Sequence, residues 1–167
     1  MPNRFTRLLR HLATGAEARL FSDGSLQRIA DAVAEGEARH RGEICFAVEP
    51  ALPVRQVLRE VQARDRAHEV FAQLRVWDTR ANNGVLVYLL LADHRIEIVA
   101  DRGLAGLVSE EQWRGACLLM EERLRAGEPV EAIVRGVAAI SDLLALHFPR
   151  SPGDIDENEL PDQPRVL

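Results

Sequence analysis

One uninterrupted apolar stretch, residues 85–92, most constrains the fold of this 167-residue chain. An Asn-Asn-Gly turn sequence ends at Gly84 immediately before the stretch, and Asp93 follows it. The stretch is much shorter than the roughly 20 residues of a membrane-spanning helix. A short apolar run between turn residues is typical of a strand that is buried on both faces. We therefore place residues 85–91 at the centre of a β-sheet.

Two further strands are predicted beside this central one. Residues 44–48 form a nearly all-apolar run closed by Pro50, which indicates a second internal strand. Residues 95–99 alternate charged and apolar side chains, which is typical of a strand with one partly wet face. A tight turn should pair this strand antiparallel to residues 85–91. A helix over 63–74 should connect the other two strands by a right-handed parallel crossover, so the sheet is mixed.

Apolar residues at helical spacing predict four helices that cover this sheet. Ser25 and Ser109 stand where helix caps are expected, and Pro129 suits a first helical turn. Helices on both faces of a mixed sheet give a three-layer α/β/α sandwich, which is the predicted fold class. The α/β domain should occupy residues 22–148. The predicted helices are residues 25–36, 63–74, 109–124 and 129–144.

Composition excludes several classes of protein. A formal charge of −5 and a pI near 5.6 argue against binding of nucleic acid, which relies on clustered basic residues. Cys45 and Cys117 match no metal or redox spacing and are expected to be reduced and buried. No phosphate-binding glycine loop, nucleophile elbow or HExxH helix is present, so the sequence offers little for nucleophilic catalysis. No organic cofactor is expected. Without a signal-peptide stretch at its start, the chain is expected to be cytosolic.

The two ends of the chain carry opposite charge. Residues 1–20 hold four arginines against one glutamate, and their apolar side chains fall on one side of a short helix. This basic amphipathic segment suits weak contact with an anionic membrane surface or an acidic partner, or docking on its own domain. Residues 149–167 are acidic and broken by prolines, so we expect a mobile tail. The helical pattern of the N-terminal segment consists of Phe5, Leu8, Leu9 and Leu12 with Arg4, Arg7 and Arg10 on the other faces.

A family resemblance rests on the centre of the chain. The sequence Asn-Asn-Gly-Val-Leu-Val-Tyr at 82–88, the hairpin, and Ile-Val-Ala-Asp-Arg-Gly-Leu at 98–104 resemble the signature of the TPM domain. Two helices joined through a glycine, here Gly127, complete the pattern over roughly residues 22–148. The resemblance implies an α/β/α fold. It also implies acid-phosphatase activity or divalent-cation binding, as in some members, and accessory roles around membrane complexes, as in others.

The loops 77–84 and 100–111 should meet at one rim of the sheet, because Gly84 opens one strand of the hairpin and Val99 ends the other. They carry hard oxygen ligands suited to Ca²⁺ or Mg²⁺. The same residues also suit plain structural roles in turns, at a strand end and at a helix start. The candidate ligands are Asp78, Asn82, Asn83, Asp101, Glu110 and Glu111, with Asp23 as a further candidate.

Two functional hypotheses follow. The first is a cytosolic TPM accessory module that binds a protein partner or a membrane-associated complex and could hold a divalent cation. The second is a metal-assisted acid phosphatase in which Asp101, Glu110, Glu111 and Asp78 supply the metal ligands. In that hypothesis Asn83 or Arg102 orients the phosphate. None of the five histidines is assigned to catalysis, and the serines that precede helices are interpreted as caps.

Overall fold

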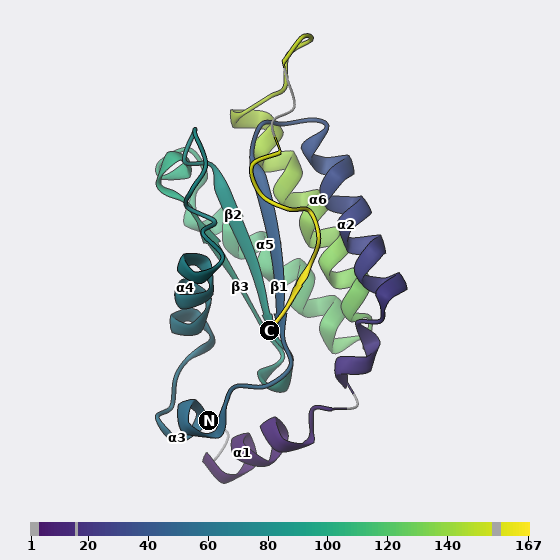
Figure 1. Cartoon of the computed structure of the whole chain (residues 1–167), viewed down its shortest axis with the longest axis vertical. Coiled ribbons are helices and arrows are strands. Elements are labelled where there is room, and N and C mark those ends of the chain that lie inside the picture. The colour runs from purple at the N-terminus through teal and green to yellow at the C-terminus, as the bar shows by residue number, and fades with distance from the viewer. Residues whose placement is uncertain (1–3, 16, 155–157) are drawn as a thin grey trace.

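The computed structural model describes residues 4–15, 17–154 and 158–167. Its strands are β1 (Glu43–Glu49), β2 (Gly84–Leu90), β3 (Arg95–Ala100) and β4 (Arg165–Val166). They form one mixed sheet in the order β3-β2-β1-β4 (Figure 1). β1 and β2 are parallel, β2 and β3 are antiparallel, and β4 runs parallel to β1. Every residue of β1 and β2 is buried, so the prediction of two internal strands is confirmed.

Helices lie on both faces of the sheet, which confirms the three-layer α/β/α fold (Figure 1). One face is covered by α2 (Asp23–Glu37), α5 (Glu110–Arg125) and α6 (Pro129–His147), and the other by α3 (Val54–Leu58) and α4 (Ala63–Gln73). The cap of α2 corrects the predicted one: Ser22 is the N-cap, and its side chain accepts a hydrogen bond from the Ser25 backbone N–H. The remaining elements are α1 (Arg4–Ala13) and the 3-10 turns η1 (Glu17–Leu20), η2 (Leu91–Asp93) and η3 (Arg102–Leu104).

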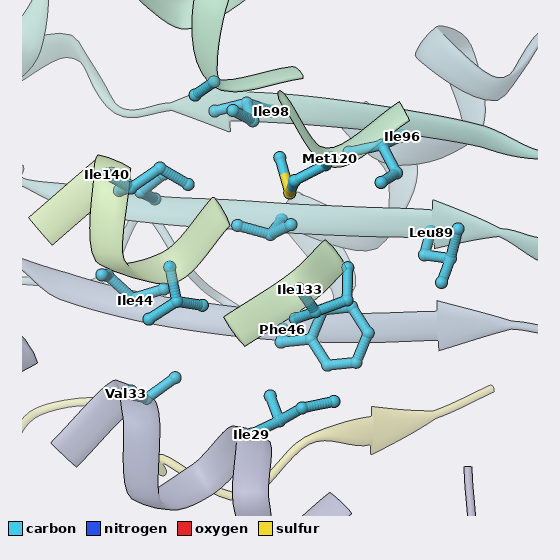
Figure 2. Packing of buried hydrophobic residues seen from close by; sticks show 14 of the residues in the cluster. Ile29, Val33, Ile44, Phe46, Leu89, Ile96, Ile98, Met120, Ile133 and Ile140 are labelled. Carbon is cyan, nitrogen blue, oxygen red and sulfur yellow. The ribbon is translucent and has the colours of Figure 1, made fainter. Parts of the chain in front are cut away.

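Alternation along the strands divides the core into two layers. Ile44 and Phe46 of β1 join the α2, α5 and α6 layer, while Cys45 and Ala47 point to the α4 layer. Figure 2 shows the first layer, where Met120 of α5 and side chains of α6 lie over the strands. Successive strand side chains point to opposite faces, so a strand that is apolar at every position buries both faces of a sheet. The long apolar run of β2 is therefore the basis of the three-layer arrangement.

The C-terminal residues differ from the predicted mobile tail. β4 extends the sheet beyond β1, with Arg165 opposite Ala47, and the side chain of Leu160 is only 7% exposed. The Leu160 backbone N–H donates to the buried Glu43 carboxylate at 3.1 Å. Residues 158–167 thus have packing partners that their acidic, proline-rich composition hides. Those partners are the edge of β1 opposite β2 and the buried carboxyl group of Glu43.

The N-terminal helix docks on its own domain, with polar residues turned inward. Arg7 contacts both carboxylate oxygens of Asp93, with Nη2 2.7 Å from Oδ2, and His11 Nε2 lies 3.2 Å from Oδ1. His11 Nδ1 accepts a hydrogen bond from the Leu52 N–H at 2.9 Å. Leu8 packs against the α4 layer, whereas other apolar side chains of the helix face outward. Phe5, Leu9 and Leu12 are 64%, 49% and 65% exposed.

None of the helices in the described residues is long and apolar enough to cross a bilayer.

Candidate functional site

An open pocket of about 760 Å³ lies along the outer edge of β3, and we call it the edge pocket. Its floor is the strand itself, and its far side is the first three turns of α5. Asp101 closes one end because it follows β3 directly and caps η3. The lining residues with a charged, hydroxyl or thiol side chain are Arg64, Arg95, Glu97, Asp101, Arg102, Ser109, Glu110, Glu111, Arg114, Cys117 and Glu121.

The loop that leads into β2 and the loop that follows β3 meet at this end of the pocket. The Asp101 backbone N–H donates to the Gly84 carbonyl at 2.9 Å, and the Gly103 N–H donates to the Asn82 carbonyl at 2.8 Å. Arg102 Nε donates to the Asn82 side-chain oxygen at 3.0 Å. Gly103 lies so close to the Asn82 backbone that an added Cβ would clash with it, which explains the glycine. These contacts fix Asp101 and Arg102 at the rim.

Four of the predicted site residues line the edge pocket: Asp101, Arg102, Glu110 and Glu111. Asp101 Oδ1 accepts a hydrogen bond from the Arg102 N–H at 2.7 Å. Its Oδ2 is buried and has no hydrogen-bond partner among the described residues. The two glutamates occupy the first turn of α5, where a carboxylate is stabilised by the helix dipole. Within the described residues, no three His, Cys, Asp or Glu side chains gather closely enough to hold a metal ion.

Asp78, Asn82, Asn83 and Asp23 do not line the edge pocket, although Asn82 contacts Arg102 at its rim. Asp78 is half-exposed and pairs with Arg75 at 2.5 Å. Asn83 is 1% exposed, and its Nδ2 donates to the Arg41 carbonyl at 2.7 Å, so it ties the entry of β1 to the entry of β2. The left-handed backbone of Asn82, with φ of 51°, turns consecutive side chains in different directions. The sequence cannot show which of two adjacent asparagines faces the rim.

The pocket has no activated hydroxyl or thiol among its described lining residues. Ser109 forms a capping box with Gln112, in which Ser109 Oγ accepts the Gln112 N–H at 3.2 Å and Gln112 Oε1 accepts the Ser109 N–H at 2.8 Å. Burial raises the pKa of the Cys117 thiol to about 11, so the thiol is protonated at neutral pH. Neither group is placed beside a histidine in this pocket.

Sequence reasoning missed the charged residues that flank the middle of β3. Glu97 lies between two arginines, with Arg64 Nη1 at 3.7 Å and Arg95 Nη2 at 3.9 Å from its carboxylate. Arg64 also donates a hydrogen bond to the Ile98 carbonyl. The charge alternation over residues 95–98 was the available signal, because it places Arg95 and Glu97 on one face of the strand.

A second pocket, of about 620 Å³, continues the first past Arg95 towards α1. The two pockets share Arg64, Arg95 and Glu97. The second pocket is predominantly basic, with five arginines against three acids, whereas the Asp101 end of the edge pocket carries three carboxylates. Charge therefore changes sign along β3. The charged residues of the second pocket are Arg4, Arg7, Arg10, Arg64 and Arg95, with Glu60, Asp93 and Glu97.

Buried carboxyl groups on the far side of the sheet have structural roles. Glu37 Oε1 accepts the Ile44 N–H at 2.7 Å, and burial raises the pKa of Glu37 to about 9. Burial also raises the pKa of Glu43. At the other end of β1, Glu49 accepts from the Tyr88 hydroxyl at 2.6 Å and from Arg66 at 2.8 Å. These groups hold strands and the C-terminal segment together.

Solved structures share this fold, among them the following two. The NMR structure of the BA42 protein from the psychrophilic bacterium Bizionia argentinensis superposes with a TM-score of 0.76 at 27% identity, over 87% of this chain and 94% of that one. The N-terminal domain of a protein from P. gingivalis gives a TM-score of 0.62 at 22% identity, over 81% and 84% of the two chains. No curated protein matches the chain. The family model for the TPM domain matches residues 16–143, and the chain therefore belongs to the TPM domain family.

Proposed function

We propose that this chain is a cytosolic accessory module of the TPM type that binds through its edge pocket. We further propose that the Asp101 end of the pocket has affinity for Ca²⁺ or Mg²⁺. The observation that carries the proposal is an open, charged pocket whose hydroxyl and thiol groups are a helix cap and a protonated cysteine. Such a pocket is suited to recognising a partner without transforming it.

The buried Asp101 Oδ2, which accepts no hydrogen bond from the described residues, supports cation affinity. Glu110 and Glu111 line the same pocket and add negative charge. These carboxylates do not form a closed metal centre, because no three ligand side chains converge among the residues that the structure describes. Water would have to supply most of the coordination sphere, so we expect weak binding. The expected Kd is about 0.1–1 mM, in the range of extracellular calcium-binding modules.

Thermal denaturation with and without about 10 mM Ca²⁺ or Mg²⁺ tests this proposal. This concentration is about 10-fold above the weakest expected Kd, about 1 mM. Cation binding to the folded state should raise the Tm of the native chain, by mass action. Asp101→Asn should abolish the shift, whereas the matched control Asp78→Asn, outside the pocket, should retain it. An equal cation-induced shift in the native chain and in Asp101→Asn would show that the cation does not bind at Asp101.

Phosphatase assays on p-nitrophenyl phosphate distinguish the accessory module from an acid phosphatase. We expect no turnover above background, with or without Mg²⁺ or Ca²⁺. Metal-dependent hydrolysis that is lost in Asp101→Asn and in Arg102→Gln would replace our proposal with a metal-assisted phosphomonoesterase. In that enzyme Arg102, which lines the pocket beside Asp101, would be the group that orients phosphate.

The outward side chains of α1 support a role near a membrane-associated complex. Phe5, Leu9 and Leu12 are exposed. Arg7 forms an ion pair with Asp93, so the helix offers less basic charge to anionic lipid than its sequence indicates. We expect weak sedimentation with vesicles containing phosphatidylserine, reduced by Leu9→Glu and Leu12→Glu. Equal sedimentation of native and substituted chains would exclude α1 as a membrane contact and leave a protein partner.

A further inference from the structure

The outer edge of β3 carries backbone groups that no strand of the described chain pairs. The Asp101 N–H donates to Gly84 of β2, so the odd-numbered residues of β3 direct their N–H and C=O groups towards β2. In an antiparallel pair this direction alternates along the strand. Ile96, Ile98 and Ala100 therefore direct theirs outward, where Arg64 donates to the Ile98 carbonyl and the Ile98 N–H contacts the Cys117 thiol. All three residues line the edge pocket.

The charges along this edge complement themselves under a two-fold rotation. Arg95 stands at one end of β3 and Asp101 directly follows the other end, equally far from Ile98 in the sequence. Arginines of α1 lie near the Arg95 end, and Glu110 and Glu111 lie near the Asp101 end. Turning the molecule by 180° about an axis beside Ile98, perpendicular to the sheet, therefore places basic groups opposite acidic groups at both ends.

We propose that the outer edge of β3 pairs with β3 of a second copy of this chain, antiparallel and in a register centred on Ile98. The two sheets would become one continuous sheet across a two-fold axis, as in an isologous dimer. Ile98 would exchange both backbone hydrogen bonds with Ile98 of the second copy, in place of its contacts with Arg64 and Cys117. Ile96 would pair with Ala100 of that copy, which uses every outward N–H and C=O group of the strand.

This register satisfies the side chains as well as the backbone. Residues opposite each other in an antiparallel pair lie on the same face, close enough to interact. Arg95 faces Asp101 of the second copy, and this pair occurs twice in the dimer. Glu97 faces Val99 of the second copy, so no like charges are directly opposed. A register shifted by two residues would place Arg95 opposite Val99 and lose both ion pairs.

Two features of the flanking helices fit the same geometry. Arg64 of α4, which contacts the Ile98 carbonyl, is 48% exposed, so it can move aside for the incoming N–H. On α5, the side chain of Leu118 is 46% exposed, and it lies on the same helical stripe as the pocket residues Arg114 and Glu121. The two-fold axis keeps both copies of α5 on one face of the joined sheet, where Leu118 becomes available for contact.

The test is the mass of the full chain by sedimentation velocity up to about 1 mM protein, with EDTA present to exclude any effect of cations. We expect a dimer for the native chain. Arg95→Glu and Asp101→Arg each place like charges opposite one another twice, so each should weaken dimerisation by at least about 100-fold, as expected for opposed like charges. A native chain that stays monomeric throughout this range would overturn the proposal.

Charge reversal separates the register from damage to the fold. An equimolar mixture of Arg95→Glu and Asp101→Arg should form a heterodimer, because both ion pairs are restored with reversed polarity in one of them. The double variant Arg95→Glu/Asp101→Arg should again form a homodimer. If the native chain dimerises but neither the mixture nor the double variant does, the proposed register is wrong.

Amide hydrogen exchange supplies a residue-level measurement. The N–H groups of Ile96 and Ala100 should exchange more slowly as protein concentration rises, whereas that of Val99, which already faces β2, should not respond. Dimerisation without this concentration-dependent protection would place the interface elsewhere and overturn the proposal. These measurements are made without cations, so failure of the cation titration above would leave them unaffected.

Discussion

The two edges of the sheet are finished in different ways. Beside β1, the chain closes the edge itself: β4 pairs with it, Leu160 is buried, and Glu43 accepts the Leu160 N–H. Beside β3, charged side chains and an open pocket take the place of a strand. Charged residues are a common way to prevent unwanted pairing of an edge strand. A sheet edge can thus be sealed by a segment of the same chain or be flanked by charged side chains.

The largest effect is expected at the closed edge, from Leu160→Ala. Truncating a buried leucine leaves a cavity and should lower the free energy of unfolding by about 3 kcal/mol in urea denaturation. Val166→Ala is the matched control in the same segment, because Val166 is 56% exposed, and it should cost less than about 0.5 kcal/mol. Equal effects of the two substitutions would show that residues 158–167 do not close the edge.

Asp93→Ala should disturb the open edge at its basic end. It removes the carboxylate that holds Arg7 and His11, whose side chains are 13% and 1% exposed. Leaving a partly buried arginine without its partner should cost about 2 kcal/mol and release α1. Limited proteolysis should then cleave within α1 first. The control Arg4→Ala alters an exposed ion pair with Glu60 and should leave the digestion pattern unchanged.

Glu37→Gln should stabilise the closed edge at alkaline pH. Because the pKa of Glu37 is about 9 in the folded protein against an ordinary 4.5, the folded state holds a proton that the unfolded chain releases. The free energy of unfolding therefore falls as pH rises from about 4.5 to about 9. Glutamine keeps the oxygen that accepts the Ile44 N–H but cannot ionise. At pH 8 the Tm should rise by about 3–6 °C, which corresponds to about 1–2 kcal/mol.

The control for the Glu37→Gln prediction is the change in Tm at pH 4 compared with that at pH 8. At pH 4, Glu37 is protonated in both the folded and unfolded states, so the substitution should change the Tm little. Glu35→Gln, on the exposed side of the same helix, should have no effect at either pH. A Tm gain that is the same at pH 4 and pH 8 would point to packing instead of ionisation.

The smallest effect on stability is expected from Arg64→Ala at the open edge. Because Arg64 is half-exposed, its contacts with Glu97 and the Ile98 carbonyl should contribute less than about 0.5 kcal/mol to folding. The same substitution should tighten dimerisation several-fold, because it uncovers the carbonyl that the second copy requires. Differential scanning calorimetry and sedimentation velocity measure the two quantities. A large loss of stability would mean that Arg64 is a fixed part of this edge and not a removable cover.

Part of the fold could be read from the sequence because the relevant forces are local. Seven consecutive buried residues in β2 and the charge alternation of β3 are set by the period of a strand, and the Asp93-His94 turn fixes their pairing. The N-cap Ser109 of α5 and the first-turn Pro129 of α6 also depend on neighbouring residues only. By contrast, the residues of the edge pocket come from α4, β3 and α5, and no sequence spacing relates them.

The sequence by itself determined β1, β2 and β3, their alternation and most helices, because these follow from short-range periodicity. The motifs at residues 82–88 and 98–104 carried the resemblance to the family. Only the tertiary structure decided that α1 turns Arg7 and His11 inward, that Asn83 is buried while Asn82 faces the rim, and that the acidic C-terminal segment returns to β1. Each of these outcomes depends on a buried polar group finding a partner distant in sequence. Such long-range pairing leaves no periodic signal in the chain.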